Sequence, residues 1–233
     1  MTRKRHGGSS AAFANKLAEL APKDSQHITK DVTGETIHNT QVVKLRRMAV
    51  TWAFPLDEVI FSKWVVNMLR LPMMPWDNIC TTQATYILDA RNTLHENFLK
   101  TSSEWLVMLD SDVLPPPDFL DRLLAHKKPM VGGWYRIKAE PYFPCVYDYH
   151  ELDAKGIHQY RLRRVPGKGL ESVGGAGAGC WLMSREVAEA VGERPYSLYL
   201  GEDLEICRKV IGAGFEVLID WDIACAHAGV ALA

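Results

Sequence analysis

The sequence lacks any run of roughly 18 or more apolar residues, the length that a helix needs to cross a membrane. Residues 1–13, MTRKRHGGSSAAF, are basic, but no apolar signal-peptide core follows them. None of the five cysteines forms a CxxC pair or joins histidines at zinc-binding spacing. These absences predict no membrane span, no secretion and no structural zinc site, so we expect a cytoplasmic protein with reduced thiols in its core.

The chain as a whole also has no excess of basic residues, since its formal net charge is −1. Residues 1–47 carry nine Lys and Arg against four Asp and Glu, whereas the rest carries 18 against 24. A slightly acidic body argues against nucleic acid as the main partner. We expect residues 1–46, which are poor in large apolar side chains, to form a basic, partly disordered N-terminal arm, either solvated or in contact with an anionic surface.

From residue 47 onwards, short apolar runs alternate with segments of helical spacing. This alternation predicts one α/β domain over residues 47–233, with a Rossmann-like, mostly parallel central sheet and helices on both faces. Residues 138–173 break the alternation and predict a small antiparallel addition. The expected strands cover residues 48–54, 84–90, 104–110, 129–135, 180–184 and 215–220, and the expected helices cover residues 56–71, 91–100, 117–128, 185–192 and 201–214.

In the stretch WLVMLDSDVLPPPDF, residues 105–119, an apolar segment expected to form a strand is followed directly by Asp110, Ser111 and Asp112. Ligands of open α/β sheets bind beyond the carboxyl ends of the strands. Residues i and i+2 of an extended segment point the same way, so both carboxylates can face one cleft, where Mg²⁺ or Mn²⁺ would offset their repulsion. Aspartates also end strands as turn formers or helix N-caps, so the spacing alone leaves both interpretations open.

Four segments, in order along the chain, resemble the nucleotide-sugar glycosyltransferases of the GT-A fold, especially those of family 2. VMLDSDVLPPPDFLDRLLAH with VGGWY resembles their donor-binding centre and its DxD motif, and ARNTLHENFL resembles the segment before it. GAGCWLMSREVAEAVG resembles their glycine-rich acceptor strand and its helix, and GEDLEICRKVIGAGFEVLIDWDIACAHAG resembles the ED helix, the last core strand and the closing histidine. The resemblance covers residues 48–229 and implies a metal-dependent hexosyltransferase. Such an enzyme moves a sugar from a UDP- or GDP-linked donor to a hydroxyl acceptor.

The resemblance also implies roles for individual residues. Asp112 would bind Mn²⁺ or Mg²⁺ directly, Asp110 would face the ribose or reach the metal through water, and His227 would supply a third metal contact. Asp203 would be the general base of an inverting reaction, and Glu202 would orient the acceptor. From the residues alone, His227 also fits a hydrogen-bonded core histidine, and Glu202 and Asp203 also fit as partners of a helix dipole. A retaining mechanism stays open.

Further candidates surround these residues. Arg91 is expected to pair with the donor diphosphate or with Asp110, and a structural ion pair is the alternative. At the end of the first strand, Phe54 and Pro55 are expected to contact the nucleotide base, and core packing is the alternative. The remaining candidates are Ser111 in the nucleotide-sugar site, and Gly177 and Trp134 in the acceptor pocket.

Two basic runs stand outside these motifs. RIK at residues 136–138 and RLRR at residues 161–164 would form either a positive lip over the diphosphate or ordinary solvated faces. The glycines of GGAGAG, residues 174–179, match no phosphate-binding loop and fit the floor of the acceptor pocket better.

Two other functions compete with glycosyl transfer. A sugar-phosphate nucleotidyltransferase would have a glycine-rich, Arg-containing loop straight after the first strand, where this sequence reads AFPLDEV. A non-catalytic sugar- or nucleotide-binding module of a larger assembly would not need the acidic residues, and the sequence retains all of them.

Overall fold

The computed structural model describes residues 47–83 and 86–229, which form a mixed α/β fold. The basic arm predicted for residues 1–46 lies outside the described residues. In the part of the chain that is described, no helix is long and apolar enough to cross a membrane.

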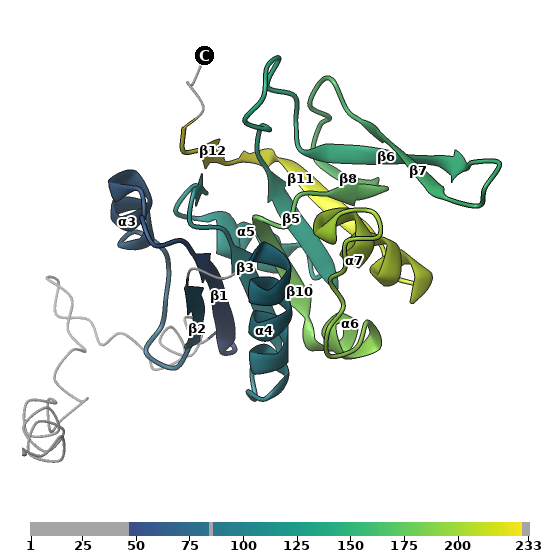
Figure 1. Cartoon of the computed structure of the whole chain (residues 1–233). Helices are drawn as coiled ribbons and strands as arrows, with labels where there is room; N and C mark the ends of the chain where they lie inside the picture. The colour runs from purple at the N-terminus through teal and green to yellow at the C-terminus, as the bar shows by residue number, and fades with distance from the viewer. Residues whose placement is uncertain (1–46, 84–85, 230–233) are drawn as a thin grey trace, which may run out of the picture. The chain divides into compact units, whose positions relative to one another are not determined.

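Seven strands form the central sheet, and they are β1 (Val50–Leu56), β2 (Asn78–Gln83), β3 (Trp105–Leu109), β5 (Met130–Trp134), β8 (Leu170–Val173), β10 (Cys180–Ser184) and β11 (Val217–Ala224). Their order across the sheet is β2-β1-β3-β10-β5-β11-β8 (Figure 1). β1 pairs in parallel with β2 and β3, and β11 pairs in parallel with β5. β10 runs against both of its neighbours, and the edge strand β8 runs against β11. The sheet is therefore mostly parallel, as predicted, with two reversed strands.

Five helices of the described ranges flank this sheet, and they are α3 (Ser62–Met68), α4 (Ile87–Leu99), α5 (Phe119–Ala125), α6 (Arg185–Ala190) and α7 (Glu202–Gly212). The side chains of β3 show how both faces are covered. Leu106 and Met108 pack in the core with α4, α6 and α7, whereas Val107 and Leu109 pack in the core with α3 and α5. Because successive strand residues point to opposite faces, an unbroken apolar run is what a strand covered on both sides requires.

Two small antiparallel sheets complete the fold. One contains β6 (Val146–Leu152), β7 (His158–Leu162) and β9 (Gly175–Ala176) in the order β7-β6-β9, and it confirms the antiparallel addition predicted for the middle of the chain. The other pairs β4 (Val113–Leu114) with β12 (Ala226–His227). Since His227 lies opposite Val113, this pairing places the last described segment beside the Asp110–Asp112 motif.

Two predicted elements are wrong. The strand expected at residues 84–90 is not formed over its described part, because Ile87 begins α4, whose residues Ala90, Leu94 and Phe98 are buried at helical spacing. The strand beside β1 is instead β2. The helix expected over residues 56–71 forms only as α3, over Ser62–Met68, and Leu56 belongs to β1 instead.

Candidate functional site

Asp110, Ser111 and Asp112 follow β3 directly, at the carboxyl end of that strand. The chain turns here, and the amide of Val113 donates a hydrogen bond to the carbonyl of Asp110 at 3.2 Å. The Asp110 amide donates to the carbonyl of Gly179 at 3.0 Å, and Nε1 of Trp64 donates to the carbonyl of Asp110 at 2.9 Å. The buried strand thus ends in a turn that is fixed by the segment before β10 and by α3.

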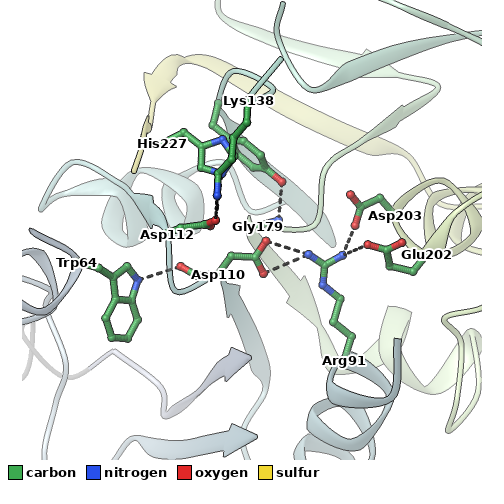
Figure 2. Close-up of polar contacts among 10 residues, drawn as sticks. Trp64, Arg91, Asp110, Asp112, Lys138, Gly179, Glu202, Asp203 and His227 are labelled. Carbon is green, nitrogen blue, oxygen red and sulfur yellow. Dashed lines mark hydrogen bonds and ion pairs between the residues drawn. The ribbon is translucent and has the colours of Figure 1, made fainter. Parts of the chain in front are cut away.

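The two carboxylates of this motif face different partners (Figure 2). Asp110 binds Arg91, whereas Asp112 binds Lys138 and lies beside His227. The i and i+2 rule applies to extended backbone, and the turn after Asp110 breaks it. The two carboxylates therefore line the same pocket without sharing one positive partner, contrary to the expectation from their spacing.

Arg91, on α4, is the centre of the site. Its side chain is only 3% exposed, and its Nη2 donates to both oxygens of Asp110 at 3.1 and 2.9 Å. Its Nη1 donates to Glu202 Oε1 at 3.1 Å and also to Asp203 Oδ1. One buried guanidinium thus joins the motif after β3 to the N-terminus of α7 (Figure 2). The pairing with Asp110 was one of the sequence-based alternatives, and the contacts with Glu202 and Asp203 were not predicted.

Burial and charge set these carboxylates apart. Burial raises the pKa of Asp110 although Arg91 opposes the shift, and the neighbouring Asp203 adds to the rise. Burial also raises the pKa of Asp203 against the opposing charge of Arg91, and Glu202 adds to it. For Asp112, burial likewise favours the neutral form, but hydrogen bonds from His227 and Lys138 outweigh it and lower the pKa to about 2. Asp112 is therefore held ionised, whereas Asp203 is moved towards the range of a proton acceptor.

Asp112 and His227 form the part of the site that fits a metal ion. Nε2 of His227 lies 3.4 Å from Oδ2 of Asp112, and Nδ1 lies 2.7 Å from the carbonyl oxygen of Arg136. A ring that donates from Nδ1 to this carbonyl would turn Nε2 towards an ion bound by Asp112, which is how a ligating histidine is held. Carboxylate and imidazole together suit Mn²⁺. Among the described residues no three His, Cys, Asp or Glu side chains gather as a ready ligand set, and Lys138 holds Oδ2 of Asp112 at 2.5 Å.

A pocket of about 380 Å³ opens beside this motif, between the end of β1 and the start of α4. Its walls include Pro55 and Ser111, both predicted for the nucleotide-sugar site. The ring of Phe54 is 2% exposed and packs edge-on against Trp64, so the structure places it in the core. Tyr86, which the sequence analysis missed, lines the pocket instead and is 59% exposed.

The glycines before β10 are packed against Tyr135, another residue that the sequence analysis missed. The Tyr135 hydroxyl accepts a hydrogen bond from the amide of Gly179 at 3.1 Å. A Cβ at Gly179 would lie 2.7 Å from Asp110 Oδ2, and one at Gly177 would collide with the Tyr135 hydroxyl. Both positions therefore require glycine, and Gly177 is a buried neighbour of the site rather than an open pocket wall. The available signal was a tyrosine at the end of a buried strand, since a buried hydroxyl needs a partner.

Trp134 lies at the end of β5, outside the Arg91 cluster. Its Nε1 donates to the carbonyl of Trp221 at 2.8 Å, and the two indole rings lie 5.6 Å apart. The structure brings together Asp110, Asp112, Arg91, Glu202 and Asp203, and it sets Phe54 and Trp134 apart from them.

Comparison with known proteins identifies the fold. No protein-family model matches the chain, and no curated protein sequence matches it. The solved structure of A197 from STIV is similar, with a TM-score of 0.54 and 16% identity over 78% of this chain and 83% of that one. The structure of GalNAc-T7 with UDP, GalNAc and Mn²⁺ is also similar, with a TM-score of 0.55 and 11% identity over 79% of this chain. The fold is GT-A-like.

The likeness to these structures lies in the arrangement of helices and strands. Because the sequence identities are low, it shows the fold alone. The match covers 44% of the GalNAc-T7 chain, so this protein corresponds to less than half of that molecule.

Proposed function

We propose that the protein is a metal-dependent glycosyltransferase that moves a sugar from a nucleotide-diphosphate donor to the hydroxyl group of an acceptor. The observation that carries this proposal is the Arg91 cluster. Its guanidinium links Asp110, on the wall of the 380 Å³ pocket, to Glu202 and Asp203 at the start of α7. A transferase needs a donor site and a proton acceptor next to each other, and this cluster joins an aspartate on a pocket wall to a candidate proton acceptor on a GT-A-like fold. The structural likeness to a protein crystallised with UDP, GalNAc and Mn²⁺ supports the same class of donor.

On the donor side, the pocket wall would hold the nucleotide. Pro55, Ser111 and the exposed ring of Tyr86 would contact the base and ribose, and Asp110 would accept a hydrogen bond from the ribose. Asp112 and His227 would hold Mn²⁺ or Mg²⁺; the carboxylate suits either ion, and the imidazole favours Mn²⁺. When bound, the ion offsets the negative charge that develops on the leaving diphosphate.

On the acceptor side, Asp203 would take the proton of the attacking hydroxyl. As the acceptor oxygen bonds to the anomeric carbon, the bond from that carbon to the diphosphate oxygen breaks, and the proton passes to the Asp203 carboxylate. Burial raises the pKa of Asp203, which favours this role, and the charge of Arg91 opposes the rise. Direct displacement of this kind inverts the anomeric centre. Glu202, held by the same guanidinium, would orient the acceptor.

The test is a calorimetric titration of UDP and GDP with and without Mn²⁺. We expect one diphosphate to bind in a metal-dependent manner, and we expect Asp112→Asn to weaken that binding roughly 10–100-fold or more. Asp118→Asn is the matched control, because Asp118 is an exposed aspartate at the start of α5 whose side chain caps no backbone amide. Loss of binding in Asp112→Asn alone supports the proposal, and absence of binding of both nucleotides to the wild type with Mn²⁺ refutes it.

A turnover assay distinguishes transfer from binding alone. We expect slow hydrolysis of a UDP- or GDP-sugar in the presence of Mn²⁺ and its loss in Asp203→Asn. Release of pyrophosphate from a nucleoside triphosphate and a sugar phosphate would instead indicate a nucleotidyltransferase.

A further inference from the structure

A second and larger pocket, of about 780 Å³, lies away from the Arg91 cluster. It is lined by the end of β7, the loop of residues 163–169 and the start of β8. β8 is an edge strand of the central sheet (Figure 1). Its volume is in the range of ligand-binding pockets. The proposed transfer reaction uses none of its residues.

The floor of this pocket is fixed by Arg163. Its Nη1 and Nη2 donate to the two oxygens of Glu171 at 2.7 and 2.9 Å, and its Nε donates to Asp148 at 2.7 Å. The guanidinium also lies 5.5 Å from the ring centre of Trp221, whose Nε1 donates to Glu171 at 2.7 Å. A forked arginine with two carboxylates and a stacked indole is an ordered arrangement, not a loosely solvated charge run.

The rim of the pocket carries positive charge without matching acids. Arg161, Arg164 and Lys168 line it and are exposed, and none of the three forms an ion pair with another residue of the described ranges. The acids in the lining are Asp148 and Glu171, and both are bound to Arg163. Three positive side chains therefore remain available to an anion.

A series of side-chain contacts links the wall of this pocket to the candidate metal site. Trp221 lies 5.6 Å from Trp134, and the guanidinium of Arg136 lies 5.9 Å from the ring centre of Trp134. The carbonyl oxygen of Arg136 is in turn bound by His227. The pocket is thus linked, through residues in contact, to His227 of the candidate metal site.

We propose that this pocket binds a phosphate monoester group carried by the acceptor, through Arg161, Arg164 and Lys168. The proposal rests on the proposed glycosyl transfer, for which it names the class of acceptor. A phosphate monoester carries about 1.5–2 negative charges near neutral pH and accepts several hydrogen bonds, so it matches three positive side chains better than one carboxylate does. The group belongs to a soluble sugar phosphate or to a lipid phosphate, since both present the same chemistry.

The first experiment is a titration of glucose 6-phosphate into the metal-free protein in EDTA. We expect binding of glucose 6-phosphate, weaker binding of glucuronate and none of glucose. The triple variant Arg161→Gln/Arg164→Gln/Lys168→Gln should lose at least roughly tenfold in affinity, because each exposed ion pair contributes up to about fivefold. Arg163 is left intact so that the floor is preserved. The control triple Lys63→Gln/Arg70→Gln/Lys100→Gln removes the same charge from exposed positions outside the lining.

A second arm identifies the source of the phosphate. The protein is sedimented with phosphatidylcholine vesicles that contain or lack phosphatidic acid. Binding to the acidic vesicles, or to glucose 6-phosphate, that is lost in the pocket triple and kept in the control triple supports the proposal. Equal loss in both triples, equal retention in both, or no binding of either phosphate probe overturns it. Since neither arm uses a metal or a nucleotide, metal-dependent UDP or GDP binding that survives such a failure leaves the proposed function standing.

Discussion

The ammonium group of Lys138 lies 2.5 Å from Oδ2 of Asp112, so the carboxylate that we propose as a metal ligand already holds a positive charge. His227 lies on the same oxygen at 3.4 Å. This pairing keeps Asp112 ionised before any metal arrives. The Lys138 side chain is 48% exposed, so it can leave Asp112 for water at small cost.

We therefore expect Lys138→Met to bind Mn²⁺ more tightly than the wild type in the absence of nucleotide. The gain should be up to roughly fivefold, because an exposed ion pair contributes about 0.2–1 kcal/mol. Titration calorimetry with MnCl₂ measures it. Lys155→Met, which removes an exposed lysine from the turn between β6 and β7, should leave the affinity unchanged. Weaker Mn²⁺ binding by Lys138→Met would show that the lysine does not compete for the site.

Arg91→Met should destabilise the fold strongly. The substitution leaves Asp110, Glu202 and Asp203 together without their common partner, and breaking a buried ion pair in this way costs roughly 3–5 kcal/mol. Urea unfolding monitored by circular dichroism gives the change in the free energy of unfolding. Arg194→Met breaks exposed pairs with Glu96 and Asp89 and should cost less than about 1 kcal/mol. Similar losses in the two variants would contradict the central role of Arg91.

The elements that sequence patterns predicted well are those with a clear local signal. β3 is apolar throughout because both of its faces are covered, and α7 has acidic residues in its first turn and glycine at its end. β2 could not be found in this way. It is an edge strand with the sequence NICTTQ, and its residues alternate between half-buried and exposed. With so few apolar residues, the sequence does not predict a strand there. The strand was instead predicted at residues 84–90, because the first apolar residues of α4 lie there.

The site was predictable in its residue types and not in its pairings. Asp110, Arg91, Glu202 and Asp203 were all named, but the bond from Arg91 to Glu202 spans 111 residues and depends on how α4 and α7 are placed by the sheet. The contact of His227 with Asp112 likewise depends on the two-residue pairing of β12 with β4. Hydrophobic periodicity predicts the structure of one element at a time, so it does not predict which side chains of distant elements come into contact.

Tyr86→Ala should weaken the binding of the nucleotide diphosphate roughly tenfold. Tyr86 is the exposed ring on the wall of the 380 Å³ pocket, and stacking of a base on an aromatic side chain contributes about 1–3 kcal/mol. Tyr86→Phe is the matched control, because it keeps the ring and removes only the hydroxyl group. Titration of the diphosphate that binds the wild type provides the comparison. If Tyr86→Phe loses as much affinity as Tyr86→Ala, the hydroxyl group and not the ring makes the contact.

His95 should make the fold less stable as the pH falls from 7 to 5. The side chain is fully buried on α4, its Nε2 lies 3.1 Å from the carbonyl oxygen of Ala188, and its Nδ1 has no hydrogen-bond partner among the described residues. Burial lowers the pKa of His95 from 6.5 to about 4. Between these values the unfolded chain takes up a proton that the folded protein does not, so acid favours unfolding, by about 2 kcal/mol at pH 5.

Urea unfolding at pH 7 and pH 5 measures this effect. His95→Gln keeps a donor for the carbonyl of Ala188 and removes the titrating ring, so its free energy of unfolding should fall less between the two pH values than that of the wild type. His150→Gln removes an exposed histidine from β6 and should retain the full dependence. Wild type and His95→Gln share every titrating group except His95. Equal pH dependence in these two proteins would therefore mean that His95 is protonated without cost, and that the contact between α4 and α6 opens readily to water.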